Sequence, residues 1–294
     1  MNAVNAPRAV TNYYYEYDHG ESFTRVTSAI TLFDPIRMTV GYMIPWLAAW
    51  ASGQTELRRD DPAQERLLNS EAKDALFQMI DELKAAADID REISLYTSLN
   101  YNCSSYGGGY SLSCPVISIP LFFLTKKGES LFENEVENPT DQPPDYWSFS
   151  EDEITFFIAR EMAHIKSNDS ILHLASKIFF LSAIFFFFTL TAPLFVSGSI
   201  ILGTGILYLL TERFLNAKLD VEAVRILTKY FDGDQERALR SAKGVMQKLI
   251  NQNIERKERE SCCTAFYLTK AGNNLLDLDY PLLTTRLEKL QDLG

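Results

Sequence analysis

The chain has 294 residues, 46% of them hydrophobic, which is enough for one large domain or two small ones with a sizeable core. Its formal net charge of -11 leaves little basic surface to neutralise a phosphate backbone, which argues against nucleic acid as a partner. The four cysteines form no C-x-x-C pair and are too few for a disulfide scaffold, which favours a reducing compartment.

Residues 1–60 form an N-terminal segment ahead of the main domain. Its first thirty residues are polar and tyrosine-rich, with no charged stretch leading into an apolar one, so no signal peptide is predicted. Residues 38–52, "MTVGYMIPWLAAWAS", are apolar but shorter than the roughly 20 residues that a membrane span needs. Two interpretations stay open for this stretch: it lies at a membrane interface, or it is a buried helix.

The first part of the main domain, residues 61–176, changes its hydrophobic period along the chain. Residues 64–87 carry apolar side chains at helical spacing and predict an amphipathic helix. Residues 92–124 are rich in β-forming residues, and the glycine run in "SSYGGGY" divides them, which predicts strands separated by a turn. A small sheet is therefore expected here.

A second helix is predicted to start after Ser150. Ser150 and Glu153 have the spacing of a capping box, in which each side chain accepts a hydrogen bond from the other residue's backbone amide. Arg160, Glu161 and His164 in "FFIAREMAHIKSND" then lie well inside this helix. Arg160 and His164, four residues apart, share one face, and Glu161 borders it.

Residues 177–211 predict a transmembrane helical hairpin. No charged residue occurs from Ile178 to Thr211, and Pro193 to Gly198 mark the turn. A hydrophobic hairpin in the core of a large helical protein is the alternative, but four consecutive phenylalanines favour the lipid bilayer as partner. Basic residues flank both ends, which predicts a membrane protein with its soluble domain in the cytoplasm (Lys166, Lys177, Arg213 and Lys218).

The second part of the main domain, residues 212–294, is helical. "RFLNAKLDVEAVRILTKYF" has apolar residues down one side, "DGD" ends it, and residues 235–258 predict a further helix. The chain closes with "LDYPLLTTRLEKLQDLG".

This order of parts resembles the HtpX-like membrane gluzincins, the metallopeptidase family that includes the CAAX prenyl proteases. In that family a strand-rich segment precedes an H-E-x-x-H helix, and a transmembrane hairpin, an E-x-x-x-D helix and a proline-containing stretch with a later arginine follow. The resemblance implies an α+β fold: a mainly helical gluzincin-like metallopeptidase domain with a small β-sheet, interrupted by the hairpin. It also implies zinc as cofactor.

The family's site positions match this chain only in part. Glu161 matches the general base, His164 the second histidine ligand and Asp220 the second-shell aspartate. Arg160 stands at the first histidine position and Asn216 at the glutamate position. His164 is therefore the sole retained ligand of a degenerate zinc site.

Catalytic zinc needs three good donors and an open position for water. A guanidinium has no lone pair and repels a divalent cation, and an amide oxygen is a poor donor, so zinc is expected to be absent or weakly bound. A buried Arg160 instead requires a carboxylate, for which Glu161, Asp220 and Glu222 are the candidates. A salt bridge from Arg160 to Asp220 would replace the metal as the link between the two helices.

Three functions stay open at this stage. The favoured one is a membrane-anchored pseudopeptidase that binds a polypeptide or protein partner without cleaving it. The second is an active, atypical zinc metalloendopeptidase for membrane-proximal polypeptides, with Glu161 as general base. The third is an unrelated membrane scaffold protein.

Overall fold

The computed structural model shows a mixed α+β fold with a four-stranded sheet. It describes residues 39, 42–52, 54–58, 70–98, 103–108, 110–120, 149–167, 194–259, 267–275 and 280–294, and short pieces between 171 and 185.

The sheet has the strand order β1-β2-β4-β3. β2 and β4 pair in parallel, while β1 on β2 and β3 on β4 are antiparallel. The prediction of a small sheet within residues 92–124 is confirmed, but β1 was missed because it is three residues long and lies in a polar stretch. The strands are β1 (Thr55–Leu57), β2 (Ser94–Ser98), β3 (Ser104–Tyr106) and β4 (Val116–Pro120).

The helices that the sequence predicts at 64–87, after Ser150 and at 235–258 are confirmed in the part of the chain that the structure describes, and residues 64–69 lie outside it. The described helices are α3 (Pro45–Ala51), α4 (Ser70–Ala86), α5 (Glu151–Ser167), α7 (Leu194–Tyr230), α8 (Gln235–Arg259) and α10 (Leu283–Asp292).

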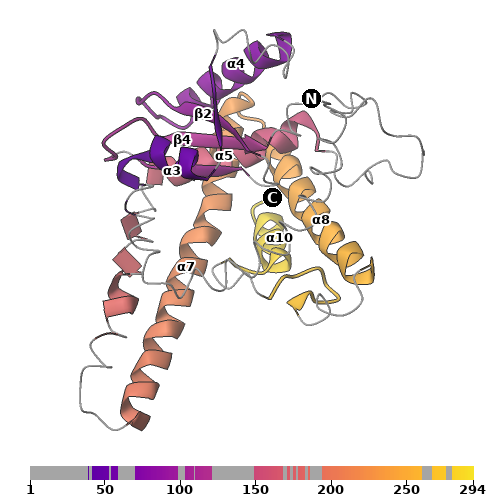
Figure 1. Ribbon diagram of the computed structural model, residues 1–294. Helices are drawn as coiled ribbons and strands as arrows, with labels where there is room; N and C mark the ends of the chain where they lie inside the picture. The colour runs from indigo at the N-terminus through magenta and orange to yellow at the C-terminus, as the bar shows by residue number, and fades with distance from the viewer. Residues whose placement is uncertain are drawn as a thin grey trace, which may run out of the picture.

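Helices cover both faces of the sheet (Figure 1). Ile117 of β4 joins Phe156 of α5 in the main core, which also takes residues from α4, α7 and α8. The preceding residue, Val116, belongs to a second small core with Ala49 of α3. Because successive side chains of a strand point to opposite faces, α5 and α3 lie on opposite sides of the sheet.

The start of α5 confirms the predicted capping box. The backbone amide of Ser150 donates to Glu153 Oε2 at 2.6 Å, and the amide of Glu153 donates to Ser150 Oγ at 3.3 Å. α8 packs closely on this end, because a Cβ at Gly244 would lie 2.6 Å from Glu153 Oε1. The cap therefore fixes both the first turn of α5 and the approach of α8.

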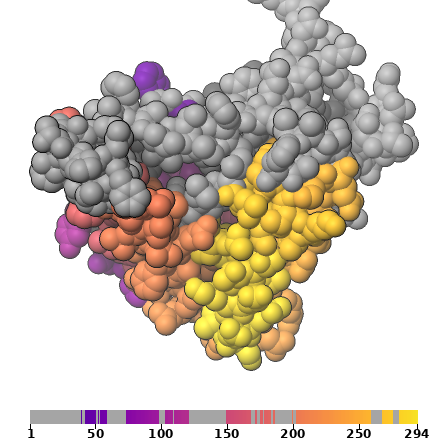
Figure 2. Space-filling view, turned by 90° about the horizontal axis from the view of Figure 1, so that it is seen from below, coloured from indigo at the N-terminus to yellow at the C-terminus, as the bar shows by residue number. Residues whose placement is uncertain are grey.

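The longest described helix, α7, has 37 residues. Its C-terminal half packs against α5 and α8, and its N-terminal half extends away from the sheet and the other helices (Figure 1). Seen from below, α7 and the C-terminal segment form neighbouring parts of the surface (Figure 2).

The predicted membrane hairpin over residues 177–211 is wrong. In the part of the chain that the structure describes, no helix combines the length and the apolar character that a membrane crossing requires. The uncharged run is not a separate unit, because α7 passes from it without a break into the stretch that carries Glu212 and Asp220, both buried. The multi-pass or hairpin-anchored membrane localisation rested on this hairpin and is also wrong.

The described residues before α7 are held to it by protein contacts. The rings of Phe180 and Tyr208 stack with their centroids 5.3 Å apart, and Ser176 Oγ donates to Glu212 Oε1 at 2.6 Å. Large apolar side chains nevertheless remain exposed along this part of α7: Leu202, Ile206, Leu207, Leu210 and Phe214.

Candidate functional site

The C-terminal half of α5 carries the candidate residues of "REMAH". Glu161 is buried, and Arg160 and His164 are of intermediate exposure. α5 packs along α7, where Asn216 and Asp220 lie buried one helical turn apart. The fold therefore brings α5 and α7 together at the positions that the family resemblance relates to one site.

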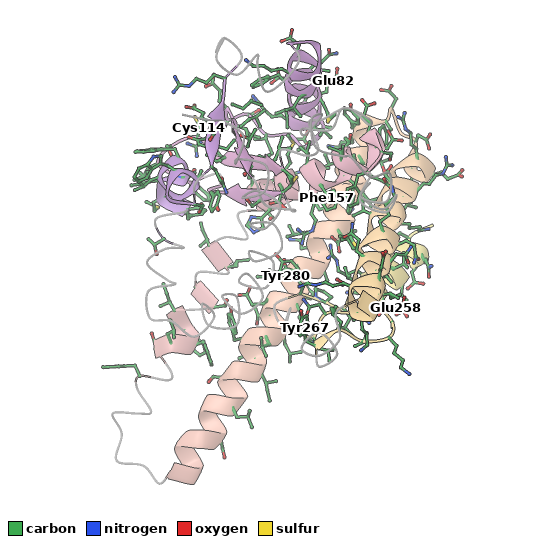
Figure 3. The ribbon with its side chains drawn as sticks, turned by 45° about the vertical axis from the view of Figure 1, so that its right-hand side comes forward. Glu82, Cys114, Phe157, Glu258, Tyr267 and Tyr280 are labelled. Atoms are coloured by element: carbon green, nitrogen blue, oxygen red, sulfur yellow. The ribbon has the colours of Figure 1, made fainter. Side chains whose placement is uncertain are left out.

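Arg160 pairs with Asp220, as the sequence predicts. Arg160 Nε donates to Asp220 Oδ1 at 3.1 Å, and the guanidinium carbon lies 5.5 Å from the centre of the Tyr280 ring. Tyr280 lies beside α7 (Figure 3). Burial alone would lower the pKa of Arg160, but Asp220, Tyr280 and Glu161 together outweigh it and raise the pKa.

Asp220 also binds a second arginine, Arg286 of α10. Arg286 Nε donates to Asp220 Oδ2 at 2.6 Å and Arg286 Nη2 donates to Oδ1 at 2.7 Å, which is a bidentate pair between buried side chains. Burial would raise the pKa of Asp220, but Arg286 and then Arg160 outweigh it and the pKa is lowered. Asp220 thus joins α5, α7 and α10 through one carboxylate.

Glu161, at the position of the general base, faces the sheet. Ser105 Oγ of β3 donates to Glu161 Oε2 at 2.7 Å, and the backbone amide of Ser105 also stabilises this carboxylate. Arg160 Nη1 lies 3.4 Å from Glu161 Oε1. Burial raises the pKa of Glu161 in spite of the opposing effects of Arg160 and Ser105.

Asn216, at the glutamate-ligand position, donates from Nδ2 to the backbone carbonyl of Glu212 at 3.1 Å. Among the described residues, His, Cys, Asp and Glu side chains form no group of three or more that could hold a metal ion. Weak or absent zinc binding stays a prediction, which rests on the donor chemistry of Arg160 and Asn216.

One further sequence candidate has other partners. Glu222, a possible partner of Arg160, pairs with Lys166 at 3.3 Å and with Arg225 at 3.2 Å. Cys103 is buried beside the site, and burial raises the pKa of its thiol. The lone histidines His19 and His173 lie outside the residues whose side chains are described.

Ser105 and Tyr280 belong to no recognisable sequence pattern and were not predicted as site residues. Arg286 was expected only as the later arginine in the family's order of parts, and no partner was predicted for it. Contacts across 56 and 66 positions of the chain, from Ser105 to Glu161 and from Asp220 to Arg286, are set by the fold and leave no local signal.

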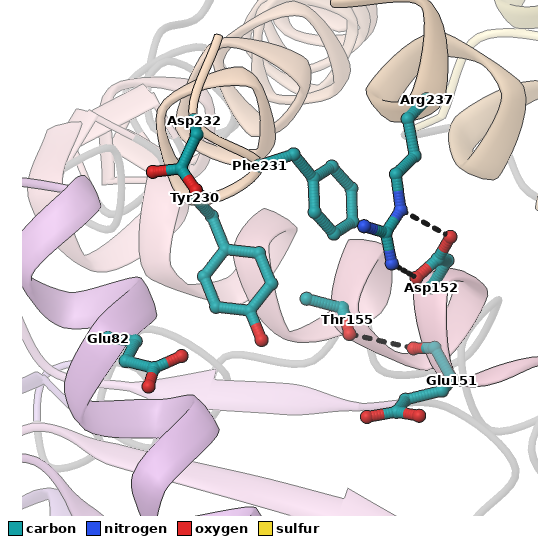
Figure 4. Close-up of a pocket in the computed structure, with 8 residues that line it drawn as sticks. All are labelled: Glu82, Glu151, Asp152, Thr155, Tyr230, Phe231, Asp232 and Arg237. Carbon is teal, nitrogen blue, oxygen red and sulfur yellow. Dashed lines mark hydrogen bonds and ion pairs between the residues drawn. The ribbon is translucent and has the colours of Figure 1, made fainter. Parts of the chain in front are cut away.

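A cavity of about 260 Å³ lies at the opposite, N-terminal end of α5 (Figure 4). Arg237 of α8 closes one side by a bidentate pair with Asp152, at 2.9 and 2.7 Å, and its guanidinium lies 4.1 Å from the centre of the Phe231 ring. These contacts clamp α8 onto α5. The cavity is separate from the site around Glu161.

No family model, no curated protein and no solved structure matches this chain. The family resemblance therefore stays a prediction from the residues and their order.

Replacing Arg286 should destabilise the protein more than replacing Arg160. Arg286→Met should lower the free energy of unfolding by about 3–5 kcal/mol, because it breaks a buried bidentate pair. Arg160→Met should cost less, because Asp220 keeps Arg286, and Arg240→Met on the surface should change stability by no more than about 0.5 kcal/mol. Urea unfolding of the three variants measures this order, and equal losses would contradict it.

Replacing Glu161 should change how stability depends on pH. Because the folded pKa of Glu161 is raised, its contribution to stability is present below the ordinary glutamate value of 4.5 and is lost as pH rises through the folded pKa. Glu161→Gln removes this titration, while that of Asp220 remains. The free energy of unfolding of the variant, relative to wild type, should therefore increase from pH 4.5 towards neutrality. Urea unfolding at several pH values tests this, and a constant difference would refute it.

Proposed function

We propose that this protein is a metallopeptidase-like pseudopeptidase that binds an extended polypeptide on the outer edge of β3 and does not cleave it. The observation that carries the proposal is the pair of arginines on Asp220. It occupies the crossing of α5 and α7, which is where the family resemblance expects a zinc ion.

The residues at this crossing suit a structural link better than a metal. Arg160 has no lone pair to donate and carries a positive charge that Asp220 stabilises. The Asn216 amide is turned to the backbone of its own helix. With one histidine as the only retained ligand, three donors for a hydrolytic zinc are not available at the family positions.

The edge of the sheet supplies the binding surface. In the described sheet β3 is an outer strand, and it lies directly beside α5. An extended peptide adds to such a strand through backbone hydrogen bonds, which tolerate many sequences. Under this proposal the protein binds polypeptides as a peptidase does but does not hydrolyse them.

Glu161 has a different role under this proposal. Without a metal-bound water there is no nucleophile for it to activate, and its carboxylate instead holds the hydroxyl and the amide of Ser105. The Ser105 amide acts on the Glu161 carboxylate and lowers its pKa. In a polypeptide strand that pairs with β3, a backbone carbonyl would accept the hydrogen bond of this amide in place of Glu161.

Fluorescein-labelled, unfolded casein tests the proposal directly. We expect its anisotropy to rise on addition of the protein, with no fragments on a gel after prolonged incubation with added zinc. Ser105→Pro removes the backbone amide N–H at this position and should weaken binding about tenfold or more, whereas Ser105→Ala keeps the amide and should bind like wild type. Circular dichroism checks that both variants are folded. Cleavage that Glu161→Gln abolishes would favour the atypical zinc endopeptidase instead.

Restoring the family's zinc ligands should restore zinc binding. Arg160→His combined with Asn216→Glu rebuilds the family's set with His164, and the double variant should bind zinc near stoichiometrically. Wild type and each single variant should hold much less than one zinc per chain after dialysis, as atomic absorption measures. Stoichiometric zinc in wild type, lost in His164→Ala, would overturn the proposal. No zinc in a folded double variant would show that α5 and α7 do not cross as in a gluzincin.

A further inference from the structure

Four large apolar side chains are exposed on one part of the molecule that the site does not use. Trp46 and Trp50 of α3 are 50% and 70% exposed, one helical turn apart. Tyr110 and Leu112, in the loop between β3 and β4, are 75% and 73% exposed. We call these four residues the aromatic surface.

The loop that carries half of the aromatic surface is fixed to the start of α3. The backbone amide of Leu112 donates to the Met43 carbonyl at 3.0 Å, and the amide of Tyr110 donates to the Tyr42 hydroxyl at 3.3 Å. Gly107 has a φ of +86°, and a Cβ there would lie 2.5 Å from Pro45 Cγ. The loop therefore approaches α3 as closely as a glycine permits.

Arg91 stabilises the same loop through hydrogen bonds to its backbone. Its guanidinium donates to the carbonyls of Gly108, Ser111 and Ser113 at 3.1, 3.0 and 3.4 Å. A loop tied by these contacts presents its exposed side chains in a fixed place. Preformed surfaces rich in tryptophan and tyrosine are typical of binding hot spots, because little conformational freedom is lost when a partner binds.

The aromatic surface lies next to the edge strand. α3 packs on β3 and β4, the half of the sheet that ends at the outer strand β3, and α3 lies beside β4 in Figure 1. Gln54 Nε2, just beyond α3, donates to the hydroxyl of Tyr106, the last residue of β3, at 3.3 Å. A strand added to β3 would therefore run past α3 on one face and past α5 on the other.

Side-chain alternation then decides what that strand must contain. On β3 itself, Ser105 points to α5, where it meets Glu161, and Tyr106 points to the α3 side, where it packs with Ala49. An added strand alternates in the same way. Every second side chain of a bound polypeptide would face the aromatic surface, which contains no charged residue.

We propose that the aromatic surface is a subsite for bulky apolar side chains of the polypeptide that pairs with β3. The protein then selects strands in which every second residue is large and apolar. This inference rests on the proposed function, because it needs a polypeptide on the β3 edge. It adds the class of sequence that the edge accepts.

Two synthetic peptides of the same composition test the inference. In one, leucine and phenylalanine alternate with threonine and serine; in the other, the apolar residues form one block. We expect the alternating peptide to bind about tenfold tighter by fluorescence anisotropy and to shift the tryptophan emission to the blue. Trp46→Ser combined with Trp50→Ser should abolish this preference, whereas Phe214→Ser, an exposed aromatic residue on α7, should leave it unchanged.

The outcomes separate this inference from the proposed function. If neither the peptides nor unfolded casein bind, the proposed function is overturned and this inference with it. If both peptides bind equally to wild type and to the tryptophan variant, the subsite is refuted while polypeptide binding on β3 stands. If phosphatidylcholine vesicles alone shift the tryptophan emission and the peptide preference survives in the tryptophan variant, the aromatic surface serves lipid and the subsite is likewise refuted.

Discussion

The carboxylate of Asp220 determines how the helical part of this protein is assembled. It lies buried between Arg160 and Arg286, and these three residues come from three different helices. Burying a charge costs desolvation free energy unless the charge is paired and hydrogen-bonded. Here the ion pairs between Asp220 and the two arginines offset part of that cost for all three groups. The two arginines must therefore approach Asp220 together, which fixes the crossing of α5 and α7 and the position of α10 on them.

The same constraint explains the chemistry of the site. A metal ion and an ion-pair cluster both hold two helices together, but only the metal polarises water. The ion pair between Arg160 and Asp220 links α5 and α7, and under the proposed function it takes the place of the metal. Glu161 is then left to the sheet, where Ser105 holds it. Burial raises the pKa of this carboxyl above its ordinary value.

The small sheet connects this site to the aromatic surface on its other side. β3 contributes Ser105 to one face and Tyr106 to the other, so its outer edge is bordered by α5 and Glu161 on one face and by α3 on the other. Under the proposed function, a polypeptide on this edge would meet both sides through the alternation of its own side chains. Beside the cavity, the ion pair between Arg237 and Asp152 joins α8 to α5.

Local patterns in the sequence determined most helices, the small sheet and the capping box at Ser150, because these depend on neighbours within a few residues. The family order also indicated that Arg160 would meet Asp220. Only the tertiary structure decided that Arg286 shares this aspartate, that Ser105 holds Glu161 and that the uncharged run continues into a charged, packed helix. Hydropathy counts residues along the chain, whereas burial and pairing depend on which distant residues the fold brings together, and for this reason the predicted hairpin was wrong.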